Sequence, residues 1–306
     1  MANEVIKKAV SCQTQHMTKY PTTDDDDGNW TMIIRPQRKW LDLRFDELWH
    51  SRDLIALFVW RDFVSVYKQT ILGPLWYLVQ PLLTSIIFTV VFGNIAKLPT
   101  DGLPEFLFYM SGTVVWSYFA ECLNKTSNTF VQNANLFGKV YFPRMAVPVS
   151  ILISNLMTFL IQFALFLFFV LYFVSRGTPI HFNWLWVLLS PLLILMMAGL
   201  GLGFGIIISS LTTKYRDLRF LVTFGVQLLM YATPVIYPVS SIPSRFQWII
   251  LVNPMTSIVE AFRYAFLGAG TVGVNHLLYS FGFTLAVVFL GSLIFNRVEQ
   301  NFLDTV

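Results

Sequence analysis

Long runs without any Lys, Arg, Asp or Glu are the feature that most limits what this chain can fold into. They cover residues 69–96, 106–120, 145–175, 177–213, 220–244, 246–259 and 264–296. A helix needs about 20 apolar residues to cross the hydrocarbon core of a bilayer. The chain is 55% hydrophobic and only 12% charged, whereas soluble domains carry about 25% charged residues. These features predict an all-α integral membrane protein.

The uncharged runs predict six transmembrane helices, at 74–96, 104–124, 147–173, 184–210, 218–238 and 275–296. The run 246–259 is too short to cross alone, and it lies in a stretch, 239–274, that proline and glycine interrupt. Asn253 suits the N-cap of a helix that has Pro254 at its first position. This stretch therefore predicts a pair of short re-entrant helices, buried against protein, before the last span.

The positions of the basic residues predict the orientation. No apolar signal-peptide core follows Met1, so we expect the N-terminus to stay in the cytoplasm. With six spans, only Lys97, Arg176, Arg245 and Arg263 of the 21 Lys and Arg residues then fall on outer segments. Because cytoplasmic loops carry the excess of basic residues, both termini are predicted to be cytoplasmic.

Residues 46–70 predict an amphipathic helix that lies in the membrane interface. One arc of its helical wheel holds Leu48, Trp49, Ile55, Ala56, Val59, Phe63, Val66 and Tyr67. The opposite arc is charged and polar, and Arg52 is the main exception on the apolar side. Gly73-Pro74 predicts an elbow, since proline cannot continue the hydrogen bonds of a preceding turn. We therefore divide the chain into a cytoplasmic tail (1–45), an interface helix (46–70) and a transmembrane domain (71–306).

Several function classes have no support in the sequence. The tail carries a basic strip, from Arg35 to Arg44, that suits anionic lipid headgroups, but a net charge of +4 gives no argument for nucleic acid. There is no GxxxxGK[ST] loop for ATP, no His, Cys or carboxylate cluster with metal-ligand spacing, and no set of catalytic groups. Glycines four apart between Gly199 and Gly205 indicate close helix packing rather than a dinucleotide site.

The loop between the second and third predicted spans is a candidate docking surface. Leu136-Phe137 and Tyr141-Phe142 would face the cytoplasm, where exposed apolar side chains indicate a partner. The alternative is a helical turn that lies on the lipid surface. Glu121 and Lys125, one helical turn apart, predict a local ion pair rather than a proton relay.

Aromatic residues are abundant, with 29 Phe, 12 Tyr and 9 Trp. Aromatic rings can pack on the apolar faces of sugars, and Tyr and Trp can also hydrogen-bond hydroxyl groups. Residues that could line such a path are Trp76, Tyr77, Phe88, Phe92, Trp116, Tyr118, Phe224 and Tyr231. The alternative for each is a side chain that faces lipid or lies in an interfacial belt.

Together, several motifs resemble a known family. They are Ile34-Arg-Pro, Asp46-Glu-Leu-Trp, Arg52-Asp-Leu, Trp60-Arg-Asp, Tyr67-Lys-Gln-Thr-Ile-Leu-Gly-Pro-Leu-Trp76, Gln80-Pro, Asn135-Leu-Phe-Gly-Lys-Val-Tyr-Phe-Pro-Arg144, Lys214-Tyr-Arg-Asp and Asn253-Pro. In combination they are similar to the permeases of polysaccharide ABC exporters, the O-antigen, teichoic-acid and capsule group of type-2 ABC transporters. The resemblance covers residue 31 to the C-terminus. Val66 departs from it, because a basic residue is expected before Tyr67.

The resemblance implies a permease subunit rather than an enzyme. Two copies would form a channel in the bacterial inner membrane for a lipid-linked polysaccharide, with O-antigen as the expected cargo. Two separate ATPase subunits would bind ATP and Mg and drive export. The segment similar to the ATPase-coupling helix contains Asn135, Leu136, Phe137, Lys139, Tyr141, Phe142 and Arg144. At the cytoplasmic entrance, Arg61 and Lys68 would meet the lipid pyrophosphate.

Two other classes stay open on the residues alone. One is a type-2 ABC permease that exports a drug or a lipid. The other is a membrane acyl- or glycosyltransferase, which should show carboxylates or histidines converging near a lumen. An ATPase gene beside this one would favour either exporter, and neighbouring glycosyltransferase genes would favour polysaccharide.

Overall fold

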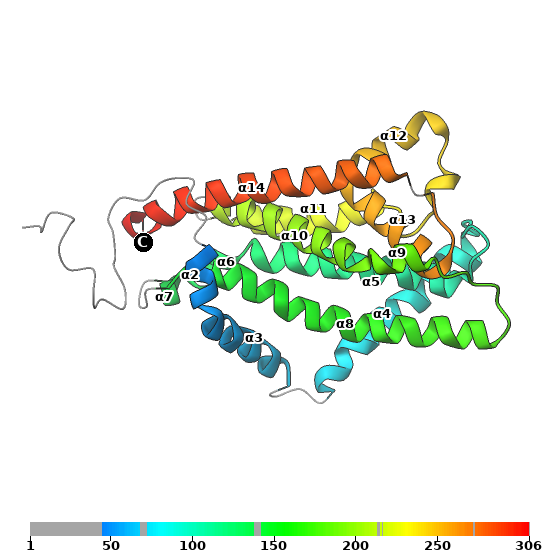
Figure 1. Cartoon of the computed structure of the whole chain (residues 1–306), viewed down its shortest axis with the longest axis horizontal. Coiled ribbons are helices and arrows are strands. Elements are labelled where there is room, and N and C mark those ends of the chain that lie inside the picture. The colour runs from blue at the N-terminus through cyan, green and yellow to red at the C-terminus, as the bar shows by residue number, and fades with distance from the viewer. Residues whose placement is uncertain are drawn as a thin grey trace, which may run out of the picture. The chain divides into compact units, whose positions relative to one another are not determined.

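The computed structural model describes residues 45–67, 72–137, 142–212, 215, 217–271 and 273–305. These residues form helices and contain no strand, which confirms the predicted all-α class (Figure 1). The helices are α2 (Phe45–His50), α3 (Arg52–Tyr67), η1 (Gly73–Leu75), α4 (Trp76–Phe88), η2 (Thr89–Ile95), α5 (Glu105–Thr126), α6 (Thr129–Gln132), α7 (Ala134–Phe137), α8 (Ala146–Ser175), α9 (Trp184–Leu188), α10 (Ser190–Thr212), α11 (Leu218–Tyr231), η3 (Val239–Ser241), α12 (Ser244–Val252), α13 (Pro254–Leu267) and α14 (Val274–Thr305). The predicted tail lies outside the described residues, apart from Phe45.

Four of the described helical segments are long and apolar enough to cross a membrane. They are Gly73–Ile95, Ala146–Ser175, Ser190–Thr212 and Val274–Val298, and each corresponds to one predicted span. The other two predicted spans correspond to α5, which has 22 residues but is less apolar, and to α11. With 14 residues, α11 is ~21 Å long at 1.5 Å per residue, which is shorter than the ~30 Å hydrocarbon core.

Two predicted spans are too long. The prediction for 184–210 misses a break at Leu189, which separates α9 from α10. Pro191 then falls in the first turn of α10, where a missing N–H costs nothing. The prediction for 218–238 continues through Pro234 and Pro238, but α11 ends at Tyr231. Proline can neither donate a helical hydrogen bond nor avoid the carbonyl of the preceding turn.

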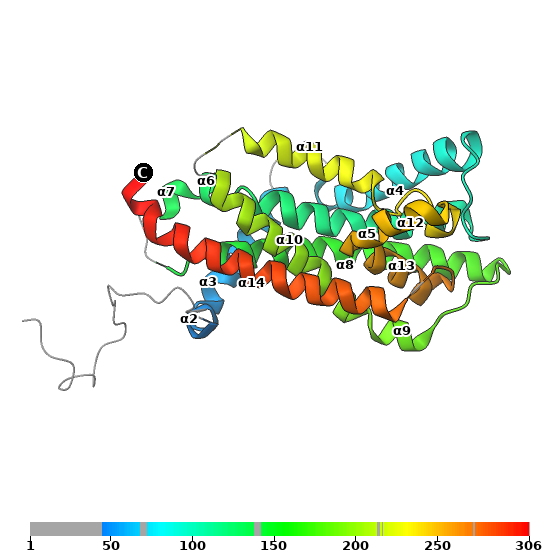
Figure 2. The same cartoon turned by 90° about the horizontal axis from the view of Figure 1, so that it is seen from above.

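The helix α10 lies at the centre, between α5 on one side and α14 on the other (Figure 2). Its glycines allow both contacts. A methyl group on Gly201 or Gly205 would lie 2.6 Å from a side-chain atom of α5, and one on Gly199 or Gly203 would lie 2.7 Å from a side-chain atom of α14. The predicted role of these glycines in close helix packing is confirmed, on two faces of one helix.

The predicted interface helix is two helices, α2 and α3, which Ser51 separates. The helix α3 packs against α8, and Phe58 is the buried one among its described side chains. After residues outside the described part, Gly73 has a φ of 48°, which favours glycine, and Pro74 follows in the first turn of η1. The predicted elbow is therefore confirmed.

The stretch after α11 contains two short helices, α12 and α13, as predicted, but the prediction that both are buried against protein is wrong for α12. The Asn253 side chain accepts a hydrogen bond from the Met255 N–H at 3.0 Å, and Pro254 is the first residue of α13, as predicted. No residue of α12 is buried, whereas most of α13 is buried against α5, α9, α10 and α14. The two helices therefore have different roles: α13 belongs to the core, and α12 lies at the surface.

Candidate functional site

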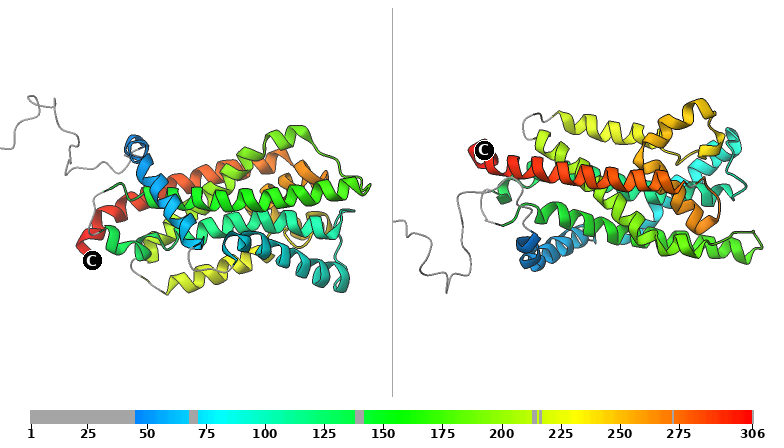
Figure 3. Two further views of the ribbon diagram at one scale, coloured as in Figure 1. Left: turned by 90° about the horizontal axis from the view of Figure 1, so that it is seen from below. Right: turned by 45° about the horizontal axis from the view of Figure 1, so that its top comes forward.

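Two helices expose aromatic and aliphatic side chains on one side of α5. Figures 2 and 3 show α4 and α11 on that side. Of the predicted path-lining residues, Trp76 of α4 is 49% exposed, and Phe224 and Tyr231 of α11 are 59% and 50% exposed. Within the described part of the chain, no element covers these side chains. They form an apolar wall that is available to a ligand or to another chain.

The other predicted path residues lie deeper. The rings of Phe88 and Phe92 pack against each other, with 5.3 Å between their centres. Both also pack against the buried ring of Tyr109 on α5, with 6.3 and 6.4 Å between the ring centres. Trp116 is only 6% exposed and packs against Phe119. The expectation that Trp116 lines a path is therefore wrong for this conformation, because the core encloses its ring. Sequence reasoning could not separate this tryptophan of α5 from the exposed one of α4.

A polar pocket of about 190 Å³ lies between α4, α5 and α8. It is lined by Tyr77, Gln80, Ser117, Tyr118, Glu121, Lys125, Asn155, Thr158, Phe159 and Gln162. The Lys125 ammonium contacts the Glu121 carboxylate at 3.1 Å, which confirms the predicted local ion pair, and donates to the Asn155 amide oxygen at 2.8 Å. Ser117 donates to the Gln162 amide oxygen at 3.1 Å. The pocket offers donors and acceptors inside an otherwise apolar bundle.

The polar pocket was missed at the sequence level, although a signal was present. Asn155 and Gln162 are seven residues apart in an apolar helix, so they lie on one face. Ser117, Glu121 and Lys125 are four apart and share a face of α5 in the same way. Sequence spacing alone could not show that these two faces meet. Predicted path residues Tyr77 and Tyr118 border this pocket.

A buried ion pair holds α13 in the bundle. Glu260 and Arg263 are 2% and 1% exposed, and their side chains contact each other at 3.3 Å. Arg263 donates to the backbone carbonyls of Pro234 and Val235, which follow α11, and its guanidinium lies 3.8 Å from the centre of the Phe108 ring. The surrounding helices therefore enclose both charged side chains.

The same ion pair also binds the segment that follows α13. A Glu260 carboxylate oxygen accepts a hydrogen bond from the Thr271 N–H at 2.9 Å. Arg263 Nε donates to the Ser111 hydroxyl of α5 at 3.3 Å. A buried charge is tolerated when its hydrogen bonds are satisfied. The pair therefore joins α5, the residues after α11, α13 and the segment that follows α13 into one unit.

The predicted coupling segment is only partly exposed. Phe137 and Phe142 are 5% and 9% exposed, so the expectation that these rings face the cytoplasm is wrong. Their ring centres are 5.7 Å apart, and the ring centres of Phe142 and Phe58 of α3 are 5.8 Å apart. Arg144 is buried, with its guanidinium 5.6 Å from the centre of the Phe137 ring. These side chains connect the interface helix to the loop after α7.

The remaining predicted coupling residues divide between two groups. Leu136 is half-buried against the same aromatic cluster. The side chains of Asn135, Lys139 and Tyr141 lie outside the described part of the chain. A docking surface formed by this segment would therefore use the residues around the aromatic cluster rather than the cluster itself.

Arg61, one of the two predicted entrance residues, lies on the exposed surface of α3. Its guanidinium binds the Asp62 carboxylate at 2.8 Å and lies 5.0 Å from the centre of the Phe58 ring. Asp62 therefore neutralises part of the charge that a phosphate would meet. The other entrance residue, Lys68, lies outside the described residues. Within the described ranges, no three His, Cys, Asp or Glu residues are close enough to hold a metal ion.

Comparisons with known proteins show what this chain is similar to. The profile of the ABC-2 type transporter family matches residues 53–267, which run from α3 to the end of α13. The O-antigen export system permease protein RfbA of Klebsiella pneumoniae is 31% identical over 254 residues, which cover 82% of this chain and 94% of the relative.

Two further relatives have similar coverage. The O-antigen export system permease protein RfbA of Myxococcus xanthus is 26% identical over 85% of this chain and 98% of its own length. The polysialic acid transport protein KpsM of Escherichia coli is 27% identical over 82% of this chain and 95% of its own length. The residues that the family profile matches include both the exposed wall of α4 and α11 and the buried α13.

Proposed function

The chain belongs to the ABC-2 type transporter family, and from this premise we propose that it is the permease half of an ATP-driven exporter of a lipid-linked polysaccharide, with O-antigen as the expected cargo. It is a transporter subunit rather than an enzyme, so ATP hydrolysis belongs to a partner ATPase that binds ATP and Mg. The observation that carries the choice of cargo is the similarity to O-antigen export permeases over nearly their full length.

The cargo is tested by deleting the gene in the source bacterium and measuring surface polysaccharide. Loss of surface polysaccharide, with lipid-linked polymer accumulating inside the cell, is the expected result, and the wild-type gene should restore export. Unchanged surface polysaccharide would reject this cargo. A type-2 ABC permease for a drug or a lipid would be favoured if the deletion instead changed drug resistance or lipid composition.

We propose six spans, with both termini cytoplasmic in the bacterial inner membrane. The helix α5 and a span formed by α11 with the buried residues 233–236 that follow it would join the four long apolar segments. The distribution of Lys and Arg supports this orientation. Two copies would pair through the exposed faces of α4 and α11, because these apolar faces have no cover among the described residues. The channel would then lie between the copies, and Trp76, Phe224 and Tyr231 would contact the glycan.

The ATPase is proposed to dock on the segment that follows α6. The aromatic cluster of Phe137 and Phe142 would stiffen this segment, so that its movement reaches α3. Lys139 and Tyr141 are better test positions than the buried rings, whose replacement would damage the core. We expect Lys139→Asp with Tyr141→Asp to release the ATPase on co-purification, and Lys97→Asp on the outer side to leave it bound. Continued association of the double variant would count against docking here.

The entrance is proposed at the end of α3, where Arg61 and Lys68 would bind the pyrophosphate of the lipid carrier. Replacing both with Gln should slow export while the ATPase stays bound. Because Asp62 already contacts Arg61, Asp62→Asn should strengthen binding of the phosphate. Export at the wild-type rate in the Arg61→Gln, Lys68→Gln variant would reject this entrance.

A further inference from the structure

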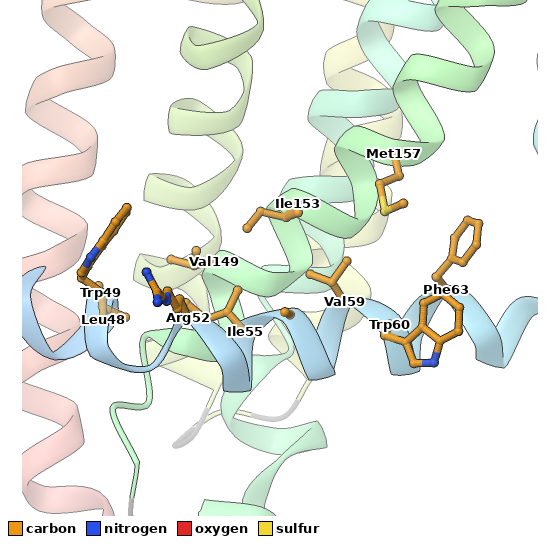
Figure 4. Close-up of a pocket in the computed structure, with 11 residues that line it drawn as sticks. Leu48, Trp49, Arg52, Ile55, Val59, Trp60, Phe63, Val149, Ile153 and Met157 are labelled. Atoms are coloured by element: carbon orange, nitrogen blue, oxygen red, sulfur yellow. The ribbon is translucent and has the colours of Figure 1, made fainter.

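An apolar groove of about 620 Å³ lies between the interface helices and the first half of α8. Figure 4 shows side chains of both elements directed into the same space. The lining residues are Leu48, Trp49, Arg52, Ile55, Ala56, Val59, Trp60 and Phe63 of α2 and α3, and Val149, Ile153 and Met157 of α8. We call this space the α3–α8 groove. Nothing among the described residues fills it.

A second apolar groove, of about 460 Å³, lies on the other side of α8, against α10. Val149 and Ile153 line both grooves, so the two run side by side along α8. From Val149 to Met157 the helix rises by ~12 Å, which is close to half of the ~30 Å hydrocarbon core. The pair of grooves therefore has the depth of one bilayer leaflet.

Arg52 is the only charged residue among those that line either groove. It is also the cation that breaks the apolar arc of the helical wheel. Its Nε lies 4.0 Å from the Asp53 carboxylate, which is outside hydrogen-bonding distance. Figure 4 shows Arg52 next to Val149, at the end of α8 where the grooves meet. A guanidinium in this place can bind a phosphate through two parallel hydrogen bonds.

We infer that these grooves bind one glycerophospholipid of the bilayer, with its phosphate on the Arg52 guanidinium and one acyl chain in each groove. Two adjacent apolar grooves fit a lipid with two chains better than a carrier with a single polyprenyl chain. The lipid is a resident ligand, not the cargo. It fills the space between α3 and α8 beside Phe58, the buried side chain of α3, and so fixes the angle between the two helices.

The test uses the full-length chain in phosphatidylcholine nanodiscs that contain some phosphatidylglycerol with a photoactivatable acyl chain. Labelled peptides should come from α3 and from residues 149–157 of α8. Arg52→Gln should reduce this labelling about tenfold, because a hydrogen bond between charged groups contributes about one factor of ten or more to binding. Ile153→Trp should abolish it, since the larger side chain blocks both grooves.

Two variants of α8 serve as matched controls. Arg176→Gln removes an exposed arginine at the far end of the helix, and Leu171→Trp adds the same bulk at a position that is 62% exposed and lines neither groove. Both should label like the wild type. Equal labelling of all four variants would show only bulk lipid contact and would overturn the inference. Protection by a polyprenyl phosphate but not by unlabelled phosphatidylglycerol, or disulfide formation between two copies of Ile153→Cys, would also overturn it.

Discussion

The helix α10 and the segment Gly73–Ile95, which contains α4, are both 23 residues long and apolar, yet they differ in what surrounds them. In the membrane-crossing window of α10, 56% of the residues are buried within the chain, against 11% for the segment that contains α4. The glycines of α10 bring its neighbours close, whereas α4 presents large side chains outward. The core around α10 is therefore complete within one chain, whereas the exposed side of α4 is left for another molecule to cover.

The largest effect is expected in the buried ion pair of the core. Arg263→Ala leaves Glu260 buried without its partner and should destabilise the chain by about 3–5 kcal/mol. Thermal unfolding in detergent measures this. Arg245→Ala, on the surface helix α12, is the control and should change stability by less than about 0.5 kcal/mol. A wild-type melting temperature for Arg263→Ala would show that the pair does not hold α13.

Two tryptophans compare the core with the wall directly. Trp116 of α5 is 6% exposed and Trp76 of α4 is 49% exposed. Trp116→Ala should destabilise the chain by about 3–5 kcal/mol, because it leaves a cavity. Trp76→Ala should unfold at nearly the wild-type temperature and should slow export. Equal losses of stability would erase the distinction between the two helices.

A pair of glycines gives a smaller and sharper contrast. A methyl group on Gly201 would lie 2.6 Å from the Cys122 side chain, whereas one on Gly225 of α11 has no neighbour within 4 Å. Gly201→Ala should therefore cost about 1–3 kcal/mol through overpacking. Gly225→Ala should be neutral, or stabilising by up to about 1 kcal/mol through helix propensity. The melting temperatures of the two variants test this contrast, and Gly201→Ala should melt below Gly225→Ala in any detergent.

The smallest change in stability is expected on the wall. Phe224→Ala and Tyr231→Ala remove exposed rings of α11, so each should alter the free energy of unfolding by less than about 0.5 kcal/mol. Both should nevertheless reduce export, which is measured as surface polysaccharide per molecule of permease. Normal export in both variants would remove α11 from the proposed glycan path.

Local patterns were enough to predict much of this fold. Uncharged runs located the long helices, Asn253-Pro254 located the start of α13, and the glycine spacing of α10 predicted close packing. The failures are non-local. Nothing in the sequence near Arg263 shows that carbonyls after α11 receive its N–H groups, and this contact accompanies the early end of α11. Likewise, Phe142 seemed exposed because its partner Phe58 lies far away in the sequence.

The site was less predictable than the fold, for the same reason. Trp76 and Trp116 have similar apolar neighbours along the chain, and only packing between helices decides which one is exposed. The polar pocket requires the face of Ser117 to meet the face of Asn155, which no local pattern specifies. Periodicity shows which residues share a face, but it does not show which faces come together.

The most direct test of the central claim is transport in proteoliposomes that contain this chain, its cognate ATPase and a lipid-linked polysaccharide. The account predicts that the polymer becomes accessible on the far side only when the permease, the ATPase and ATP are all present. ATP hydrolysis by the purified chain alone, or polymer movement without the ATPase, would contradict it.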